Sequence, residues 1–378
     1  IKNDNVFGTQ ILADWDLYQL LRIEKPLSGT EWLLSTDYLS ERGFGLGTTL
    51  EYQRDGCCTF PGPVTGWFDA WGINDSGLDD LGLNRRSVQP DTEWRGRAYW
   101  RHRQELPNGC QITAQLGLIS DRNFLEQYLE REWDEWKDRT TSLELKRSWD
   151  SQSLRVMGQV RLNESVSQTE WLPRLDHFLV GRSLLRDSLT WYGHSQASYA
   201  NFRTLDPPTD PQDANGWMFL PWERPDETIQ GGRFATRQEI DLPLQVGGLK
   251  VVPYLLGEAA FWQEILDGEE DVTRAYGQIG LRTSLPFWRT DPTVQSLLFN
   301  LNGMAHKVTL VGDLFWSDAT QNIEEFPLYD PLDDDSQEHF RRYLGVTPWE
   351  YDPRNFAFRS RMQRWVSAPS VEMVDDLS

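Results

Sequence analysis

The chain has 378 residues, of which 39% are hydrophobic, and it carries a formal net charge of −21. So acidic a chain is a poor partner for nucleic acid, and it has no apolar run of about 18 residues, the length that a membrane-spanning helix needs. A helical membrane protein is excluded, whereas a transmembrane β-barrel is not, because its lipid-facing residues alternate with polar ones.

Strand-like segments recur along the chain, each bounded by clusters of Gly, Pro, Asn or Asp. Several reach the roughly 9 to 11 residues that a tilted strand needs to cross a bilayer, whereas a soluble strand typically has about 5 to 6. In chain order they cover residues 14–23, 31–39, 45–54, 65–72, 93–105, 111–119, 142–149, 153–162, 188–202, 235–244, 249–262, 275–287, 307–316 and 356–366. The pattern predicts an all-β fold, a large antiparallel transmembrane β-barrel.

The connections between these segments are of two kinds. Residues 150–151 and 246–248 form tight turns, whereas residues 202–234 and 316–356 form long connections. Outer-membrane barrels have short periplasmic turns and longer outer loops. We therefore expect long loops at one end of the barrel.

Residues 93–103, E-W-R-G-R-A-Y-W-R-H-R, have different chemistry on alternate positions. Trp94 and Trp100 share one face of the predicted strand, because successive side chains point to opposite sides. The opposite face carries four arginines: Arg95, Arg97, Arg101 and Arg103. Exposing an arginine to lipid costs about 2 to 4 kcal/mol near the midplane. We therefore expect the arginines to face the lumen and the tryptophans to face lipid.

The same alternation occurs in other predicted strands, at residues 46–53, 111–118, 154–162 and 356–363. It places four further arginines on polar faces: Arg155, Arg161, Arg359 and Arg361. Guanidinium groups bind phosphates and carboxylates through paired hydrogen bonds, so such a wall could guide an anionic lipid head group. Ion pairing with Glu and Asp of neighbouring strands is the alternative, and it needs no cargo.

Residues 121–138 break the strand pattern. Their apolar residues follow helical spacing behind Ser120 or Asp121 as the cap: Phe124, Leu125, Tyr128, Leu129, Trp133 and Trp136. We interpret the segment as one loop helix lying across the barrel mouth. An ordinary surface helix would carry the same residues.

The three cysteines allow at most one bridge. Cys57 and Cys58 are adjacent and cannot bond to each other without strain, so either one could pair with Cys110.

Motifs for chemistry are absent from the sequence. The five histidines are scattered without metal-ligand spacing, and no phosphate-binding loop occurs, so we expect no metal and no cofactor. His194 and Ser195 are adjacent in a predicted strand and point apart, which excludes a nucleophile and base pair. No two carboxylates stand out as a glycosidase pair. We expect the protein not to be an enzyme.

Eighteen Trp and twelve Tyr residues fit the aromatic belts of a membrane protein. A soluble, Trp-rich protein that binds or cleaves glycans is the alternative, because Trp also stacks on sugar rings. A general outer-membrane porin or receptor is a second alternative.

Six segments carry a family resemblance: residues 1–20, 37–47 (D-Y-L-S-E-R-G-F-G-L-G), 120–126 (S-D-R-N-F-L-E), 172–179 (L-P-R-L-D-H-F-L), 236–244 (T-R-Q-E-I-D-L-P-L) and 252–260 (V-P-Y-L-L-G-E-A-A). In this order they resemble the barrel of the LptD family, also called Imp or OstA, of the Gram-negative outer membrane.

The resemblance implies an outer-membrane translocon that inserts lipopolysaccharide into the outer leaflet through a polar lumen and a lateral gate. It implies as partners lipopolysaccharide, membrane lipid, a plug lipoprotein of the LptE type and a periplasmic bridge of the LptA type, which docks on an upstream jelly-roll domain. Residues 1–378 would then be part of the barrel domain, without the jelly-roll domain and the last strands. The family's interdomain disulfides and gate prolines cannot be placed on this chain.

Overall fold

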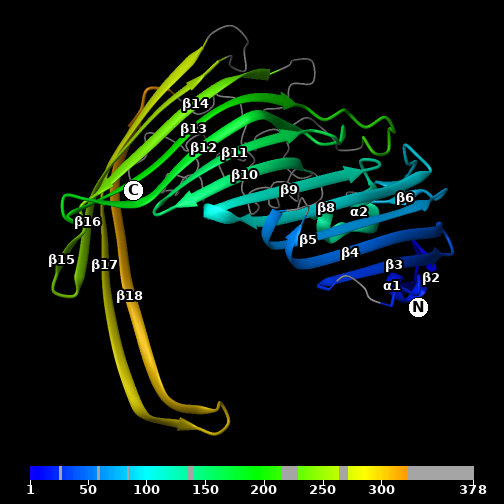
Figure 1. The fold of residues 1–378 in the computed structure, drawn as a ribbon, viewed down its shortest axis with the longest axis horizontal. Helices are drawn as coiled ribbons and strands as arrows, with labels where there is room; N and C mark the ends of the chain where they lie inside the picture. Colours follow the sequence, from blue (N-terminus) through cyan, green and yellow to red (C-terminus); the bar gives the residue numbers. More distant parts are fainter. Residues whose placement is uncertain are drawn as a thin grey trace.

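The computed structural model describes residues 1–24, 28–57, 60–82, 85–134, 140–214, 229–263 and 271–321. Within them, a strongly curved antiparallel sheet of 16 strands dominates the fold (Figure 1). Its strands are β1 Lys2–Asp4, β2 Gly8–Asp16, β3 Thr30–Leu39, β4 Gly43–Cys57, β5 Phe60–Asn74, β8 Trp94–Leu106, β9 Cys110–Ile119, β10 Thr141–Trp149, β11 Gln152–Val160, β12 Gln168–Leu184, β13 Leu189–Arg203, β14 Ile229–Asp241, β15 Leu244–Val246, β16 Leu249–Trp262, β17 Val272–Ser296 and β18 Leu301–Ala319. A two-stranded sheet of β6 (Asp79–Asp80) and β7 (Arg86–Val88) lies in the connection between β5 and β8.

The expectation of antiparallel strands is confirmed. The short strands β1, β6, β7 and β15 were not expected, and β17 and β18 are longer than the predicted segments 275–287 and 307–316. Two further corrections concern residues 17–23 and β12. Residues 17–23 do not continue a strand: β2 ends at Asp16, whose carboxylate accepts a hydrogen bond from the Gln19 amide and caps the short helix α1 (Leu17–Leu20). The sequence reading also missed β12, because Pro173 and the surrounding charges interrupt the apolar alternation. The predicted strand at residues 356–366 lies outside the described residues.

The predicted loop helix is present but broken. It consists of α2 (Phe124–Tyr128) and α3 (Glu130–Asp134), and Leu129 between them leaves helical geometry at φ −139° and ψ 50°. Neither expected residue caps α2. Ser120 and Asp121 are engaged with β8 instead, where they bind the Gly96 amide and the Arg95 guanidinium. Residues 135–139 lie outside the described part of the chain.

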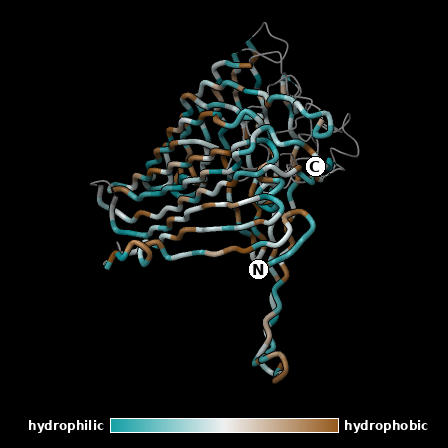
Figure 2. Tube along the Cα trace, turned by 90° about the vertical axis from the view of Figure 1, so that its right-hand side faces the viewer, coloured by the Kyte–Doolittle hydropathy of each residue, from teal (hydrophilic) through white to brown (hydrophobic). Residues whose placement is uncertain are grey.

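The two faces of the sheet follow from the strand register. On β8, Trp100 lies opposite Phe68 and Leu116, whereas Arg101 lies opposite Trp67 and Gln115. We call the face that carries Trp100 the outer face and the face that carries Arg101 the inner face. Helix α2 packs on the inner face. The alternation appears along individual strands as changes between brown and teal (Figure 2).

Short and long connections lie at opposite ends of the sheet from β4 onward. Connections at residues 107–109, 150–151, 185–188 and 297–300 form the short-turn end. The connections that follow β5, β9 and β13 form the long-loop end. The expected asymmetry is therefore confirmed for the described connections, although the connections on either side of β3 do not follow it. Most of the predicted long connection at residues 316–356 lies outside the described residues.

The sheet has two separate edges among the described residues. β18 pairs with β17 alone, and β2 pairs with β3 and, through Gly8 to Gln10, with β1. The sheet is not closed there. Beyond Ser284, β17 pairs only with β18, and the two strands project from the short-turn end (Figure 1). No helix in the described part of the chain is long and apolar enough to cross a membrane.

The backbones of β5 and β8 approach each other closely at Gly96. A methyl group at Gly96 would lie 2.4 Å from the Trp71 carbonyl oxygen and 2.9 Å from the Gly72 Cα, so Gly96→Ala forces these backbones apart. We expect it to lower the free energy of unfolding by about 1 to 3 kcal/mol. Gly277→Ala is the control, because nothing lies within 4 Å of its Cβ position. Urea unfolding followed by tryptophan fluorescence compares them, and equal midpoints would contradict the close approach.

Candidate functional site

Arg95 is the centre of a buried cluster at the long-loop end of the inner face. Its guanidinium lies 2.6 Å from Asp79, 2.9 Å from Asp121 and 3.3 Å from Asp75, and its side chain has no exposed surface. Arg42 adds a second cation 3.2 Å from Asp75. The cluster joins β5, β6, β8 and the segment after β9. It therefore fixes the long loops to the inner wall.

Tyr128 attaches α2 to this cluster. Its hydroxyl donates a hydrogen bond of 2.7 Å to Asp75. Burial and the neighbouring Asp75 carboxylate raise the pKa of the Tyr128 phenol, so it stays a neutral donor. Burial also raises the pKa of Asp79, despite the Arg95 and Arg42 cations beside it. A neutral tyrosine hydroxyl therefore holds α2 in place, and the hydrogen bond does not require an ionised group on the helix.

The remaining arginines of β8 also lie on the inner face, but their ion pairing weakens toward the short-turn end. Arg97 binds Asp69 and Glu132. Arg101 is exposed and donates to the Tyr99 hydroxyl at 2.7 and 3.1 Å. Arg103 is also exposed and pairs with Glu105 of its own strand at 2.9 Å. Arg95 and Arg97 are therefore matched by the protein's own carboxylates, whereas Arg101 is available to a ligand.

The other predicted arginines divide into three groups. Arg155 lies on the inner face, 2.8 Å from Asp176 and 3.5 Å from Glu144. Arg161 does not join the wall, because β11 ends at Val160 and its guanidinium instead donates to main-chain carbonyls of the connection to β12. Arg359 and Arg361 lie outside the described residues.

The two predicted lipid-facing tryptophans lie on the outer face of β8. Trp94 is 74% exposed. Trp100 is half-buried, and its indole donates to the Tyr52 hydroxyl at 3.1 Å, which in turn lies 2.7 Å from His102 Nδ1. Trp94 is therefore free to contact its surroundings, whereas Trp100 belongs to an aromatic cluster.

A second set of arginines, on β12, β14 and β17, was missed by the sequence reading. Each guanidinium lies over an aromatic ring: Arg174 and Arg233 over Trp171 at 4.9 Å, Arg237 and Arg274 over Tyr276 at 5.6 and 5.5 Å, and Arg282 over Tyr254 at 3.8 Å. We call this set the arginine–aromatic wall. Alternation of R-F-A-T-R-Q-E-I-D at residues 233–241 was a usable signal. Arg174 could not be assigned to a face in the same way, because a register shift between Trp171 and Arg174 interrupts the alternation along β12.

Carboxylates from neighbouring strands neutralise the wall. Glu258 lies 3.1 Å from Arg274 and 3.4 Å from Arg237, and it is 5% exposed. The Asp176 carboxylate lies 2.8 to 3.0 Å from side-chain nitrogens of Arg155, Arg174 and His194. Such pairs are required wherever charges are buried, because an unpaired buried charge is strongly destabilising. The carboxylates therefore hold the arginines of the arginine–aromatic wall in place and neutralise their charge.

Several buried polar atoms on the inner face of β13 have no hydrogen-bond partner among the described residues, and His194 Nδ1 is one of them. Gln196 Nε2 and Ser198 Oγ, two positions apart on the strand, are two others. Buried polar atoms in native structures are nearly always paired with protein, water or ligand. These atoms are buried, so the inner face of β13 carries polar groups that the described residues leave unsatisfied.

The long loops are also tied to one another. Arg85 lies 2.6 Å from Glu126 and 2.9 Å from Asp213, so it bridges three connections. The backbone amides of Gln212 and Gln89 donate to Asp210 and hold the pKa of its carboxyl below the ordinary range. The described parts of the connections that follow β5, β9 and β13 are thus tied together at the long-loop end.

The disulfide prediction stays a prediction. Cys110, at the start of β9, is partly exposed and forms no disulfide with a described residue. Cys58 and the side chain of Cys57 lie outside the described residues. No group of three or more His, Cys, Asp or Glu side chains that could hold a metal ion occurs within the described ranges.

Arg95 and Arg103 lie on the same face of the same strand and make a matched pair for mutation. Arg95→Gln leaves the buried Asp79 and Asp121 carboxylates without their nearest cation, and we expect it to cost about 3 to 5 kcal/mol of stability. Arg103→Gln removes an exposed pair worth about 0 to 1 kcal/mol. Limited trypsin cleavage after Arg131, with urea unfolding alongside, measures both. Equal protection of the two variants would show that the cluster does not fix the loops.

A scan against protein-family models finds no match for the chain, and a search of curated proteins finds no significant match either.

Proposed function

We propose that this chain is part of a transmembrane β-barrel that inserts lipopolysaccharide into the outer leaflet of a Gram-negative-type outer membrane. The observation that carries the proposal is the division of the sheet into a charged, aromatic inner wall and an apolar outer face. A polar lumen for an amphipathic cargo and a lipid surface for the barrel require this division. The choice of lipopolysaccharide as the cargo rests on the resemblance to the LptD family.

The outer face suits a hydrocarbon environment. Its exposed residues include Leu143, Val156, Leu175, Leu255 and Ile279. Its polar side chains in the middle of β13 and β14 bind one another: Ser195 to Thr236 at 2.8 Å, Trp191 to Gln238 at 2.8 Å and Gln238 to Thr236 at 2.9 Å. Satisfied polar groups can be placed in lipid at far lower cost than unsatisfied ones.

The inner wall suits the polar half of lipopolysaccharide. Arginines bind phosphate and carboxylate through paired hydrogen bonds, and aromatic rings offer flat surfaces to sugars. Arg101 is an exposed cation on this face that donates to the Tyr99 hydroxyl, so its charge is a contact point for the cargo. Because most other arginines are already paired, the cargo would move along the wall without being trapped.

The remaining partners follow from this assignment. A plug lipoprotein of the LptE type would fill the lumen, and a bridge of the LptA type would deliver cargo at the short-turn end. The edges at β2 and β18 would be completed by further strands of the barrel, since unpaired backbone groups are not tolerated in lipid. The protein would act without covalent chemistry and without a cofactor.

Photocrosslinking from two neighbouring residues of β8 tests the proposal directly. A photoreactive benzoylphenylalanine replaces Arg101 on the inner face or Trp100 on the outer face, in the complete protein within cells. We expect lipopolysaccharide adducts at position 101 and only phospholipid adducts at position 100, because the two side chains point to opposite faces. Adducts are read on gels probed for lipopolysaccharide. The same adduct pattern at both positions contradicts a lumenal path.

The two alternative functions have outcomes of their own. Absence of lipopolysaccharide adducts, together with diffusion of small solutes through the reconstituted protein, would identify a porin. A chain that stays monomeric and folded without detergent and binds glycans would be a soluble glycan-binding protein. Either result removes the translocon proposal.

A further inference from the structure

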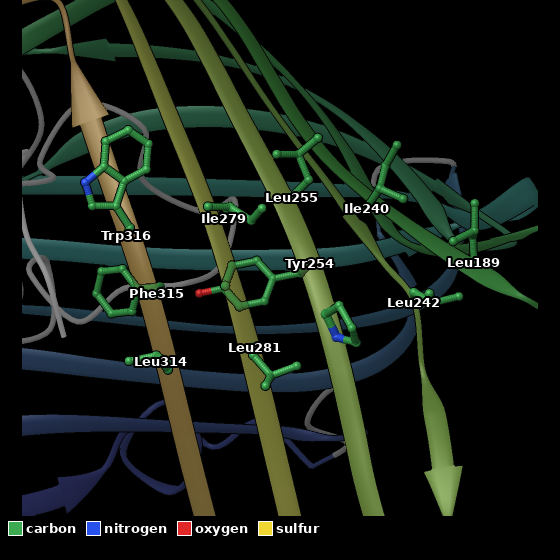
Figure 3. A pocket seen from close by; sticks show the side chains of 12 residues that line it. Leu189, Ile240, Leu242, Tyr254, Leu255, Ile279, Leu281, Leu314, Phe315 and Trp316 are labelled. Atoms are coloured by element: carbon green, nitrogen blue, oxygen red, sulfur yellow. The ribbon is translucent and has the colours of Figure 1, made fainter.

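Two rows of apolar side chains border a shallow depression on the outer face near the β18 edge. One row runs across four strands as Ile240, Leu255, Ile279 and Trp316, each directly opposite the next. A second row, one step nearer the short-turn end, contains Pro253, Leu281 and Leu314. The depression has a volume of about 660 Å³. Figure 3 labels Ile240, Leu255, Ile279 and Trp316 of the first row and Leu281 and Leu314 of the second.

The lining is almost entirely hydrocarbon. Of its twelve residues, only Tyr254 and Trp316 have a polar side-chain atom, and the Tyr254 hydroxyl already accepts a 2.7 Å hydrogen bond from Gln278. A protein interface typically has about one hydrogen bond per 100 to 200 Å². This depression offers almost nothing for such bonds. Its chemistry favours a hydrocarbon chain over a protein surface.

The depression lies toward the short-turn end of the sheet. Ile240 is the penultimate residue of β14, and Leu189, which also lines the depression, is the first residue of β13. Short turns lie on the periplasmic side of outer-membrane barrels. If the outer face contacts the membrane, the depression therefore opens into the leaflet on the periplasmic side.

We propose that this depression binds an acyl chain of a membrane phospholipid at a fixed position beside the β18 edge. The inference rests on the proposed membrane placement of the outer face and adds a defined lipid site to it. Leu255, Ile279 and Leu314 are 58 to 63% exposed in the protein alone, so an acyl chain would remove a contiguous apolar surface from water. The volume lies within the roughly 300 to 1,000 Å³ of small-molecule sites.

The test fills the depression and measures retained lipid. Leu255→Trp places a large ring in it, whereas Leu143→Trp adds the same ring to the outer face of β10; the two leucines are 61% and 60% exposed. Each protein is reconstituted in vesicles of palmitoyl-oleoyl phosphatidylethanolamine, extracted and exchanged into detergent. Native mass spectrometry then counts bound phospholipid. We expect the original protein and Leu143→Trp to retain phospholipid equally, and Leu255→Trp to retain several-fold less.

Three outcomes would overturn the site: equal retention by all three proteins, preferential retention of lipopolysaccharide from mixed vesicles, or a lipid-free dimer that Leu255→Trp dissociates. Quenching of Trp94 fluorescence by brominated phospholipid, measured against Trp94→Phe, tests the membrane placement separately. Quenching at Trp94 with unchanged retention removes only the lipid site. Absence of quenching at Trp94 removes the proposed placement itself.

Discussion

Ion pairs between neighbouring strands hold the inner face of this sheet together, and the other features of the structure depend on them. Asp176 and Glu258 each pair with cations from two strands, and Arg95 pairs with carboxylates from the connections that follow β5 and β9. A strand carries successive side chains to opposite faces, so charge concentrated on one face leaves apolar residues on the other. The same alternation that creates the polar wall therefore creates the apolar outer face.

The ion pairs have two consequences for function. At the long-loop end they fix the loops: Arg95 anchors the segments on either side of β8, and Arg85 ties these segments to the connection after β13. Along the wall they hold arginines against aromatic rings, as Trp171 is held between Arg174 and Arg233. A wall of this kind spreads its charged and aromatic groups over several strands. This suits passage of a large amphipathic molecule better than its capture.

The alternation of polar and apolar residues predicted much of this arrangement, because the face on which a strand residue lies depends only on its position along the strand. The faces of β8 and the bounds of β16 followed from alternation and length alone. The partners of Arg95 did not, because Asp75, Asp79 and Asp121 come from loops whose positions depend on the whole fold. The apolar depression likewise requires the registers of four strands. β12 was missed because Pro173 breaks its alternation, and α2 starts late because Asp121 binds Arg95.

The division of the sheet between two solvents is the central claim, and a spin-label scan of β14 tests it most directly. Single labels at residues 233–241 are placed in a cysteine-free protein reconstituted in bilayers. The account predicts that accessibility to oxygen, which concentrates in lipid, peaks at positions 234, 236, 238 and 240, whereas positions 233, 235, 237, 239 and 241 stay low. Absence of a two-residue period, or access of a water-soluble nickel reagent to the even positions, would contradict it.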